Sequence, residues 1–317
     1  MFKLFRSFAS PKALKKEGVL NMNARNFSII GQFNSRRLYP LVDDKVKTKD
    51  LASQVGIQTP RLIAVIKAQY EVKNILELVK GWKGFVIKPA HGSGGKGVLV
   101  IKSYTKNRFR TASNKIIKFT EVYQHISNVL SGLYSLGGQY DEAIIEEVVS
   151  FSDIFKDYSF QGIPDVRVIV FKGYPAIAMM RLATKESGGR ANLHQGAVGV
   201  GIDIKTGKAI AAVQHNRPIT HHPDTGADLM TLKVPDWQLH LEIAAKGYDM
   251  TGLGYLGADI VMDKELGPMM LELNARPGLA IQIANQKGLV HILEEIETYP
   301  KNLSFKERVN FVLNKKD

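Results

Sequence analysis

Three oxygen-bearing side chains near the C-terminal end of the sequence, Asp259, Glu272 and Asn274, are of the types that bind divalent cations. Residues 257–262 and 270–274 are mostly apolar, and this composition predicts two β-strands. Side chains alternate along a strand, so Glu272 and Asn274 are expected to point to the same face. The question is whether Asp259 reaches that face from the other strand.

The register of the two strands depends on the loop that joins them. Lys264–Gly267 has the composition of a four-residue hairpin loop. With that loop, Asp263 faces Pro268, and counting back along both strands places Asp259 directly opposite Glu272. The sequence therefore predicts that two carboxylates and one amide oxygen converge on one spot.

This ligand set indicates which metal it would bind. Hard oxygen ligands suit Mg²⁺, which takes one or two carboxylates and completes its shell with water and nucleotide phosphates. Mn²⁺ accepts ligands of the same kind. A polar face on an ordinary hairpin would show the same three residues, so both interpretations stay open at this point.

A glycine-rich loop between two further predicted strands, residues 85–88 and 98–101, has the composition of an anion-binding site. Glycines leave its backbone amides free to approach an anion closely, and Lys88 and Lys96 add positive charge. The residues expected to contact phosphate are Gly92, Ser93, Gly94 and Gly95. A flexible loop without a ligand is the alternative.

The loop differs from the common phosphate-binding motifs. It fits the string G-x-G-x-x-G, but that fingerprint must open a helix, and this loop is expected to run into a strand. The chain contains no Walker A sequence and neither the H-R-D nor the D-F-G string of a protein kinase. What remains is a β-hairpin phosphate clamp with a lysine on the entering strand.

Composition limits the classes of protein to consider. The chain has 317 residues, enough for two lobes that each have a core. It has no cysteine, which excludes thiolate metal sites and cysteine nucleophiles and fits a reducing compartment. No apolar run approaches the roughly 20 residues that span a bilayer, so we expect no transmembrane segment and a cytoplasmic location. The net charge of +13 attracts anions such as nucleotides, acidic peptides or nucleic acid.

The pattern of breakers and apolar runs divides the chain into three predicted segments. These are an N-terminal helical segment (1–44), a lobe with the glycine-rich hairpin (45–148) and a lobe with the metal site (149–317). Within the lobes, the pattern predicts helices at 44–56, 71–80, 120–135 and 237–246, and further strands at 143–149, 165–171 and 174–182. Residues 102–118 carry six Lys or Arg and no acid.

Residues 40–300 resemble the ATP-grasp superfamily in three features and in their order along the chain. These are the glycine-rich hairpin preceded by Lys88, which we call the lysine-led hairpin, then a strand with two adjacent glutamates, and then the Asp…Glu-x-Asn set. Within this superfamily, the sequence is most similar to the RimK-like α-L-glutamate ligases. Three strings resemble that group's D-I-R, R-S-N-L-H-x-G and V-N-A-x-P-G-L signatures: Asp165-Val-Arg167, Arg190-Ala-Asn-Leu-His-Gln-Gly196 and Leu273-Asn-Ala-Arg-Pro-Gly-Leu279.

The resemblance implies an α+β ATP-grasp fold, with two α/β lobes that grip ATP between them after a short N-terminal segment. It also implies a reaction. A substrate carboxylate attacks the γ-phosphorus of ATP, and an amine then displaces phosphate from the acyl phosphate to form an amide or peptide bond. Glutamate or another amino acid would be added to a peptide or small-molecule acceptor.

The resemblance further implies residue roles. Lys45 and Lys88 would contact the α- and β-phosphates, and Asp165 the ribose hydroxyls. The adenine edge would come from Glu146, Glu147, Val148 and Val149. Mg²⁺ would be held by Asp259, Glu272 and Asn274. The residues that would face the γ-phosphate and the acyl phosphate are Arg190, Asn192 and Arg276.

The acceptor stays open, because the N-terminal segment is shorter than the domain that usually precedes an ATP-grasp core. An ATP-grasp ligase for sugar-linked or cell-envelope precursors is one alternative, and a non-catalytic basic protein that binds nucleic acid or a membrane surface is another. We favour ATP and an acidic amino acid or peptide as partners over nucleic acid, because both lysines and the full metal set are present. Residues 102–118, with Arg181 and Arg190, are expected to attract the acidic substrate. A homo-oligomer is compatible with the sequence.

Overall fold

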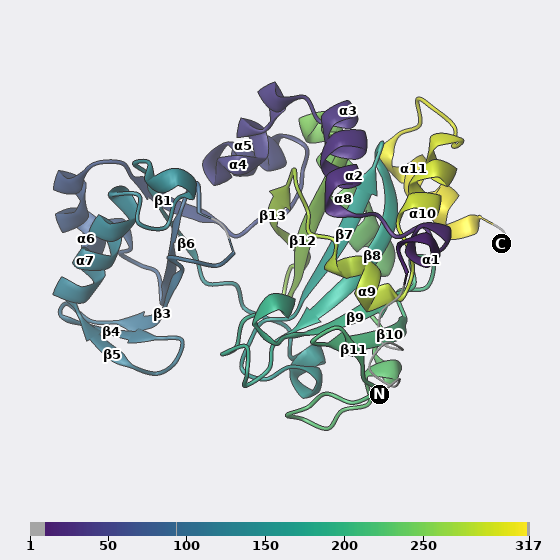
Figure 1. The fold of residues 1–317 in the computed structure, drawn as a ribbon. Coiled ribbons are helices and arrows are strands. Elements are labelled where there is room, and N and C mark those ends of the chain that lie inside the picture. The colour runs from purple at the N-terminus through teal and green to yellow at the C-terminus, as the bar shows by residue number, and fades with distance from the viewer. Residues whose placement is uncertain (1–9, 93, 316–317) are drawn as a thin grey trace. The chain divides into compact units, whose positions relative to one another are not determined.

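The computed structural model describes residues 10–92 and 94–315, which form two compact units (Figure 1). One unit is drawn from the described parts of Met1–Tyr39 and Ser152–Asp317, and the other is Pro40–Phe151. Both combine helices with an antiparallel sheet, which confirms the predicted α+β class. The predicted segments 1–44, 45–148 and 149–317 stay predictions, and residues 10–39 group with the C-terminal part of the chain.

The unit Pro40–Phe151 is built on a six-stranded sheet with the order β1-β6-β2-β3-β4-β5. Its strands are β1 (Leu62–Ile66), β2 (Phe85–Pro89), β3 (Leu99–Tyr104), β4 (Arg108–Thr111), β5 (Ile116–Lys118) and β6 (Ala143–Glu147). Its helices are α4 (Pro40–Asp43), α5 (Lys45–Gln54), η4 (Gln69–Asn74), α6 (Ile75–Leu78), α7 (Phe119–Leu130) and η5 (Leu136–Gly138).

Alternation along these strands separates a buried face from an outer face. Phe85, Ile101 and Phe109 are fully buried and form a core with apolar residues of α7. Residues of the other parity point away from this core, and they include Lys88 on β2 and Glu146 on β6. The sheet therefore has one structural face and one face that carries charged groups.

The second unit is built on a seven-stranded sheet with the order β11-β10-β9-β8-β7-β12-β13. Its strands are β7 (Asp165–Phe171), β8 (Tyr174–Leu182), β9 (Val198–Ile202), β10 (Ala209–Gln214), β11 (Arg217–Pro218), β12 (Tyr255–Asp263) and β13 (Gly267–Asn274). Its longer helices are α1 (Pro11–Lys16), η2 (Arg25–Ile30), η6 (Asp153–Tyr158), α8 (Trp237–Thr251), α9 (Ala280–Asn285), α10 (Val290–Glu297) and α11 (Phe305–Asn314). Its three-residue helices are α2 (Met22–Ala24), α3 (Gly31–Phe33), η3 (Arg36–Leu38), η7 (Leu193–Gln195) and η8 (Leu229–Thr231).

Central strands β7 and β12 carry different side chains on the two faces of this sheet. One face holds Ile169, Phe171 and Tyr255, which pack with apolar residues of α9 and α10. The same parity continues along the strands to Arg167 and Asp259. Helix α8 packs on β7, β12 and β13 and covers the opposite face (Figure 1). Charged residues thus occupy one end of a face whose other end is apolar core.

Most predicted strands are present, but several predicted helix ends are wrong. Helix α7 ends at Leu130 rather than near residue 135, and the segment 71–80 is a 3₁₀-helix followed by a short α-helix. Helix α8 continues through Gly247, which was expected to end it. A Cβ atom at Gly247 would lie 3.2 Å from the Leu273 side chain, so this glycine allows the helix to pack closely on β13. Among the described residues, no helix is long and apolar enough to cross a membrane.

Candidate active site

Asp259 on β12 lies directly opposite Glu272 on β13, as the sequence predicts. The length of the loop and the pairing of the residues next to it differ from the prediction. Asp263 pairs with Gly267, so the loop is one residue shorter than expected. A β-bulge next to Asp259 adds one residue, Leu271, on β13 and restores the predicted pairing.

Two arginines bind the carboxylate of Asp259. Arg167 lies opposite it on β7 and donates from Nε to Oδ1 at 2.7 Å and from Nη2 to Oδ2 at 2.6 Å. Arg181 on β8 donates from Nη2 to Oδ2 of Asp259 at 2.8 Å, and from Nε to Oδ1 of Asp165 at 2.6 Å. Both aspartates are buried. Two guanidinium charges therefore balance two carboxylates within one network.

Burial and charge oppose each other on the two aspartates. Burial by itself raises the pKa of Asp259, but the charges of Arg167 and Arg181 outweigh it and bring the pKa to about 2. Burial raises the pKa of Asp165 to about 6 in spite of Arg181, and the nearby charge of Asp259 adds to the rise. Asp259 is therefore ionised at neutral pH, whereas Asp165 titrates much closer to neutrality.

The predicted metal ligands carry donor atoms that fit Mg²⁺. Glu272 is half-buried, and its side chain makes no hydrogen bond or ion pair with the part of the chain that the structure describes. Asn274 pairs with Gly257 on β12, and its Oδ1 accepts the N–H of Arg276 at 2.9 Å. An amide or carboxylate oxygen that accepts one hydrogen bond keeps a further lone pair, so these residues and Asp259 could hold a hard cation. Within residues 10–92 and 94–315, no three Asp, Glu or His side chains form a metal-holding group, and the metal set of Asp259, Glu272 and Asn274 stays a prediction.

In the unit Pro40–Phe151, Glu146 is a buried carboxylate held between two lysines. Lys88 Nζ lies 2.5 Å from Oε1, and Lys49 Nζ from helix α5 lies 2.9 Å from Oε2. Lys49 also donates to the Pro60 carbonyl at 2.5 Å. Oε2 of Glu146 makes no well-aligned hydrogen bond with described residues despite this ion pair. This oxygen is shielded from solvent, and Lys49 is the charged group beside it.

The charges of this cluster favour an anion beside it. Burial would raise the pKa of Glu146, but Lys88 and Lys49 lower it below its ordinary range. Burial is also the largest influence on Lys49 and lowers its pKa, against the attraction of Glu146. Lys49 is not among the residues predicted from the sequence. Its signal is the spacing of four residues from Lys45, which puts both lysines on one side of α5.

The glycine-rich loop joins β2 to β3, as predicted, and does not open a helix. Gly94 and Gly95 have φ angles of +63° and +72°, and a Cβ atom at either position would meet nothing within 4 Å. These glycines therefore provide the left-handed backbone conformation rather than room for packing. Lys45 Nζ donates to the Gly92 carbonyl at 2.6 Å, at the entry of the loop. Ser93, one of the predicted phosphate contacts, lies outside the described residues.

Asp141 anchors the same entry. It accepts hydrogen bonds from the backbone N–H of His91 at 3.1 Å and from Ser135 Oγ, and its Oδ1 lies 2.8 Å from His91 Nδ1. Gly92 forms a β-bridge with Ser135. Burial would raise the pKa of Asp141, but its hydrogen bonds to Ser135 and His91 lower it. Neither His91 nor Asp141 is predicted from the sequence, because their partnership spans 50 residues.

The predicted adenine and ribose contacts differ in their surroundings. Strand β6 ends at Glu147, so Val148 and Val149, expected to continue it, follow as half-buried residues outside the strand. Glu147 is exposed, and its N–H donates to the Arg61 carbonyl at 2.9 Å. Asp165 remains the predicted ribose contact, although its buried carboxylate is already bound by Arg181. A ribose would have to share that carboxylate.

The three residues predicted to face the γ-phosphate lie in the unit that contains Ser152–Asp317. Arg190 is exposed and makes no ion pair with the described residues. Asn192 is half-buried, and its Oδ1 accepts the N–H of His194 at 3.0 Å. The Arg276 guanidinium lies over the Tyr39 ring at 4.7 Å. None of the three side chains is fully buried, and their roles stay predictions.

Residues 102–118 form the end of β3 and all of β4 and β5. Arg108 lies directly opposite Lys118, and Arg110 opposite Ile116, on the outer face of the sheet. Like charges directly opposite each other are unfavourable, and these three cations make no ion pair within the described residues. We call the exposed residues Lys102, Lys106, Arg108, Arg110 and Lys118 the basic face. Arg181, expected to assist them, is ion-paired with Asp165 and Asp259, and its part in attracting substrate stays a prediction.

Most of the chain matches the model of a known protein family. The family model described as sugar-transfer associated ATP-grasp matches residues 24–298. The chain belongs to this family. The predicted ATP-grasp membership and fold are thereby confirmed, and the matched segment contains both the lysine-led hairpin and the carboxylate pair.

This ATP-grasp protein is similar to a protein of Legionella pneumophila (strain Corby) named probable alpha-L-glutamate ligase. The two are 25% identical over 267 residues, which cover 84% of this chain and 66% of the relative. The chain thus spans just under two thirds of the relative's length. The name agrees with the predicted likeness to α-L-glutamate ligases.

Two solved structures are also similar to the ATP-grasp protein. The D-cycloserine synthetase DcsG is 15% identical with a TM-score of 0.49, over 87% of this chain and 73% of that chain. D-alanyl-alanine synthetase A of Vibrio cholerae is 10% identical with a TM-score of 0.48, over 87% of this chain and 65% of that chain.

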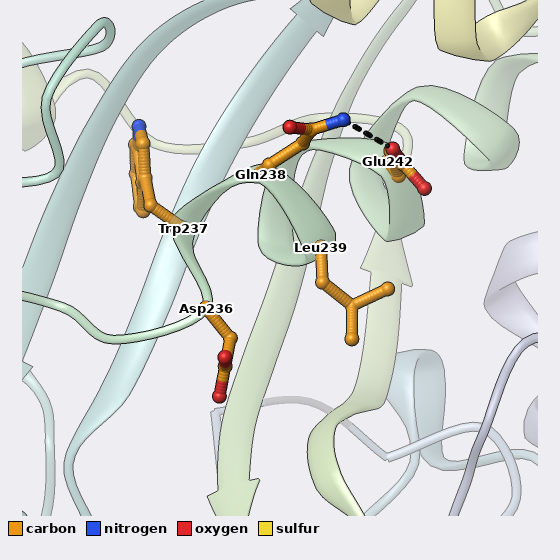
Figure 2. Close-up of a pocket in the computed structure, with 5 residues that line it drawn as sticks. All are labelled: Asp236, Trp237, Gln238, Leu239 and Glu242. Atoms are coloured by element: carbon orange, nitrogen blue, oxygen red, sulfur yellow. Dashed lines mark hydrogen bonds between the residues drawn. The ribbon is translucent and has the colours of Figure 1, made fainter.

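A surface pocket of about 310 Å³ lies at the start of α8 in the ATP-grasp protein (Figure 2). Its lining residues are Asp236, Trp237, Gln238, Leu239 and Glu242. Gln238 Nε2 donates to Glu242 Oε1 at 2.9 Å, so two of its polar groups satisfy each other. The pocket contains no predicted site residue, and α8 covers the sheet face opposite Asp259. We therefore assign it no part of the chemistry.

Proposed function

We propose that the chain is an ATP-dependent, ADP-forming carboxylate–amine ligase that acts through an acyl phosphate. The family match over residues 24–298 carries this proposal. It is supported by the pairing of Asp259 with Glu272 and by the buried cluster of Lys88 and Glu146, which both lie inside the match. The proposal places the enzyme in the cytoplasm, where ATP is available.

We assign nucleotide-binding roles to residues of each unit separately. In Pro40–Phe151, Lys45 and Lys88 would bind the α- and β-phosphates, and the amides of the glycine-rich loop would donate to them. Glu146 and the backbone of residues 147–149 would serve the adenine. In the other unit, Asp259, Glu272 and Asn274 would hold Mg²⁺ or Mn²⁺. When bound, the metal supplies positive charge that neutralises phosphate oxygens.

The reaction needs no covalent enzyme nucleophile. A substrate carboxylate oxygen attacks the γ-phosphorus, and the bond between that phosphorus and the ADP oxygen breaks. The amine nitrogen then attacks the acyl carbon, phosphate leaves with the bonding electrons, and the amine loses a proton. Arg190 and Arg276 would stabilise the negative charge that develops on the acyl oxygen and the phosphate.

We further propose an acidic amino acid or peptide, such as glutamate or a glutamate-ended peptide, as a substrate. The basic face supports this, because its cations make no ion pairs with described residues and attract anions. The name of the Legionella relative points to the same substrate class.

A sugar-linked substrate is the second candidate. The description of the matched family, sugar-transfer associated, favours it. The chemistry would be unchanged, with an amino sugar as the amine or a sugar acid as the carboxylate.

Release of ADP across a panel of substrates tests the proposal. The panel combines amino acids, acidic peptides, amino sugars and sugar acids, with mass spectrometry of the products. A condensation product with one ADP per bond supports the ligase, and its composition chooses between the two substrate classes. A protein that binds ATP but releases no ADP with any pair would favour the non-catalytic alternative.

A further inference from the structure

Both carboxylate oxygens of Asp259, a predicted metal ligand, are occupied by arginine. Arg167 binds both of them, and Arg181 adds a third hydrogen bond to Oδ2. The side chain of Asp259 is only 5% exposed, and those of Arg167 and Arg181 are 11% and 14% exposed. A divalent cation at this carboxylate would therefore lie next to two positive charges that water screens poorly.

The network is neutral as it stands. Asp165 and Asp259 balance Arg167 and Arg181, and Glu272 opposite Asp259 adds one negative charge without a partner among the described residues. A single spare carboxylate is a weak attraction for a free dication that must also approach two guanidinium groups. Mg-nucleotide is different, because its phosphates bring negative charge that the guanidinium groups can bind instead.

We propose that Arg167 and Arg181 act as internal counter-ions, which keep Asp259 from binding a divalent cation until nucleotide phosphates arrive. This inference rests on the proposed function and concerns the order in which the site fills. Arg167 and Arg181 would bind the nucleotide phosphates in place of Asp259, and the Asp259 carboxylate would then be available to a metal that the nucleotide brings. Arg167 and Arg181 are thus positioning residues that couple metal binding to nucleotide binding.

A purely structural role for the same ion pairs makes a different prediction. Arg167 and Arg181 also connect β7, β8 and β12, and such a connection would stay intact when nucleotide binds. The two roles are separated by measurements on the metal and on the arginines.

Binding of Mn²⁺ in the absence of nucleotide, followed by electron paramagnetic resonance, is the first test. Wild type should bind Mn²⁺ no better than millimolar. Arg181→Met should bind it roughly tenfold tighter or more, because one of the two opposing charges is gone. Arg181→Lys keeps the charge and should resemble wild type, and adding Glu272→Gln to Arg181→Met should abolish the gain. Arg308→Met is the matched control, since Arg308 is a buried arginine bound to Asp249 outside this network.

A second measurement is made on wild type, with Lys variants used only for assignment, and stands even if the Met variant does not fold. The Nε–H signals of Arg167 and Arg181 in ¹⁵N-labelled protein, assigned with Lys variants, should shift when Mg²⁺ and a non-hydrolysable ATP analogue are added. Unchanged arginine signals in the nucleotide complex would overturn the inference. So would nucleotide-free binding of Mn²⁺ to wild type as tight as to Arg181→Met, and in both cases the ligase proposal would stand. Failure to bind nucleotide at all would instead refute the proposed function.

Discussion

Asp259 and Arg167 lie directly opposite each other on β12 and β7, and the guanidinium group binds the carboxylate through two of its nitrogen atoms. On its other side, β12 presents the same aspartate to Glu272 on β13. One buried carboxylate thus has a cation on one neighbouring strand and a second carboxylate on the other. The carboxylate of Asp259, on the strand between β7 and β13, therefore lies at the centre of the candidate site.

Replacement of Glu272 by Gln should abolish most metal-dependent turnover. The change keeps the shape of the side chain but removes the one carboxylate of the predicted metal set that lacks a partner among the described residues. We expect Mg²⁺-dependent ADP formation to fall by orders of magnitude while the circular dichroism spectrum stays unchanged. Glu265→Gln, an exposed carboxylate in the loop between the same two strands, is the control. Near-normal ADP formation in Glu272→Gln would refute the metal assignment.

The raised pKa of Asp165 predicts how stability depends on pH. Its pKa is raised from 3.8 to about 6, so between these values the folded protein holds a proton that the unfolded chain releases. This contribution to stability is complete at low pH and is lost as the pH rises towards 6. Asp165→Asn cannot titrate, so its free energy of unfolding relative to wild type should increase by about 2–3 kcal/mol from about pH 4 to about pH 7.

Urea unfolding of both proteins at the two pH values measures this difference. Asp259 titrates in the opposite sense, since its lowered pKa of about 2 makes its contribution present above pH 4 and lost below it. It is present in both proteins and largely cancels. An unchanged difference in stability between the two pH values would show that Asp165 has an ordinary pKa.

The glycine-rich loop should become more protected when nucleotide binds. Gly94, Gly95 and Lys96 are exposed, and Cβ atoms at the two glycines would meet nothing within 4 Å, so the free loop has little packing to hold it. Hydrogen exchange across residues 90–97 should slow on addition of Mg-ATP. Exchange that is already slow in the free protein, or that ATP does not change, would contradict a phosphate clamp.

Asp141→Asn should loosen the entry of this loop. The variant loses the charge that binds His91 and Ser135, so we expect a several-fold higher KM for ATP and faster exchange at residues 90–92. Glu142→Gln is the matched control, because the side chain of Glu142 makes a partly exposed ion pair with Lys67 and its backbone contacts are kept. Equal effects of the two substitutions on KM would show that Asp141 does not position the loop.

The basic face should act on the acidic substrate and leave ATP unaffected. Changing Lys106, Arg108 and Arg110 to Ser should raise the KM for the acidic substrate while that for ATP stays nearly constant. Changing Lys12, Lys301 and Lys306 to Ser removes the same charge from the other unit and should leave both constants unchanged. Equal turnover of the first triple variant and wild type at low substrate concentration would refute the steering role. Binding of nucleic acid that falls steeply with salt, whatever the nucleotide state, would favour the rival partner.

Local pattern was sufficient to predict the strands β2, β3, β6, β7, β8, β12 and β13 and the Asp259–Glu272 pair, whereas β4, β5, β9, β10 and β11 were not predicted. The pair is correct because two errors cancel: the loop is one residue shorter than predicted, and a bulge at Leu271 adds that residue back. Bulges leave little trace in an apolar pattern, so a predicted register is less certain than the strands it joins. Ends of helices were harder, as Gly247 shows, because a glycine that allows close packing looks like one that ends a helix.

Most of the side chains that contact the site residues could not be predicted from the sequence. Arg167 stands in a recognised motif, but its contact with Asp259 spans 92 residues and arises only when β7 and β12 pair. Arg181, which by its charge alone was expected to attract substrate, is bound by Asp165 opposite it on β7 and by Asp259 on β12. Lys49 could have been found from its helical spacing to Lys45, whereas Asp141 offers no such local signal.

Transfer of oxygen from the substrate carboxylate to phosphate tests the central claim most directly. The substrate pair identified by ADP release would be supplied with ¹⁸O in the carboxylate, and the released phosphate analysed by ³¹P NMR. An acyl phosphate places one carboxylate oxygen in each phosphate, so we predict one ¹⁸O atom in each phosphate released and one amide bond per ADP. Phosphate without ¹⁸O, in the presence of ADP release, would mean that water attacks ATP and would contradict the proposed ligase mechanism.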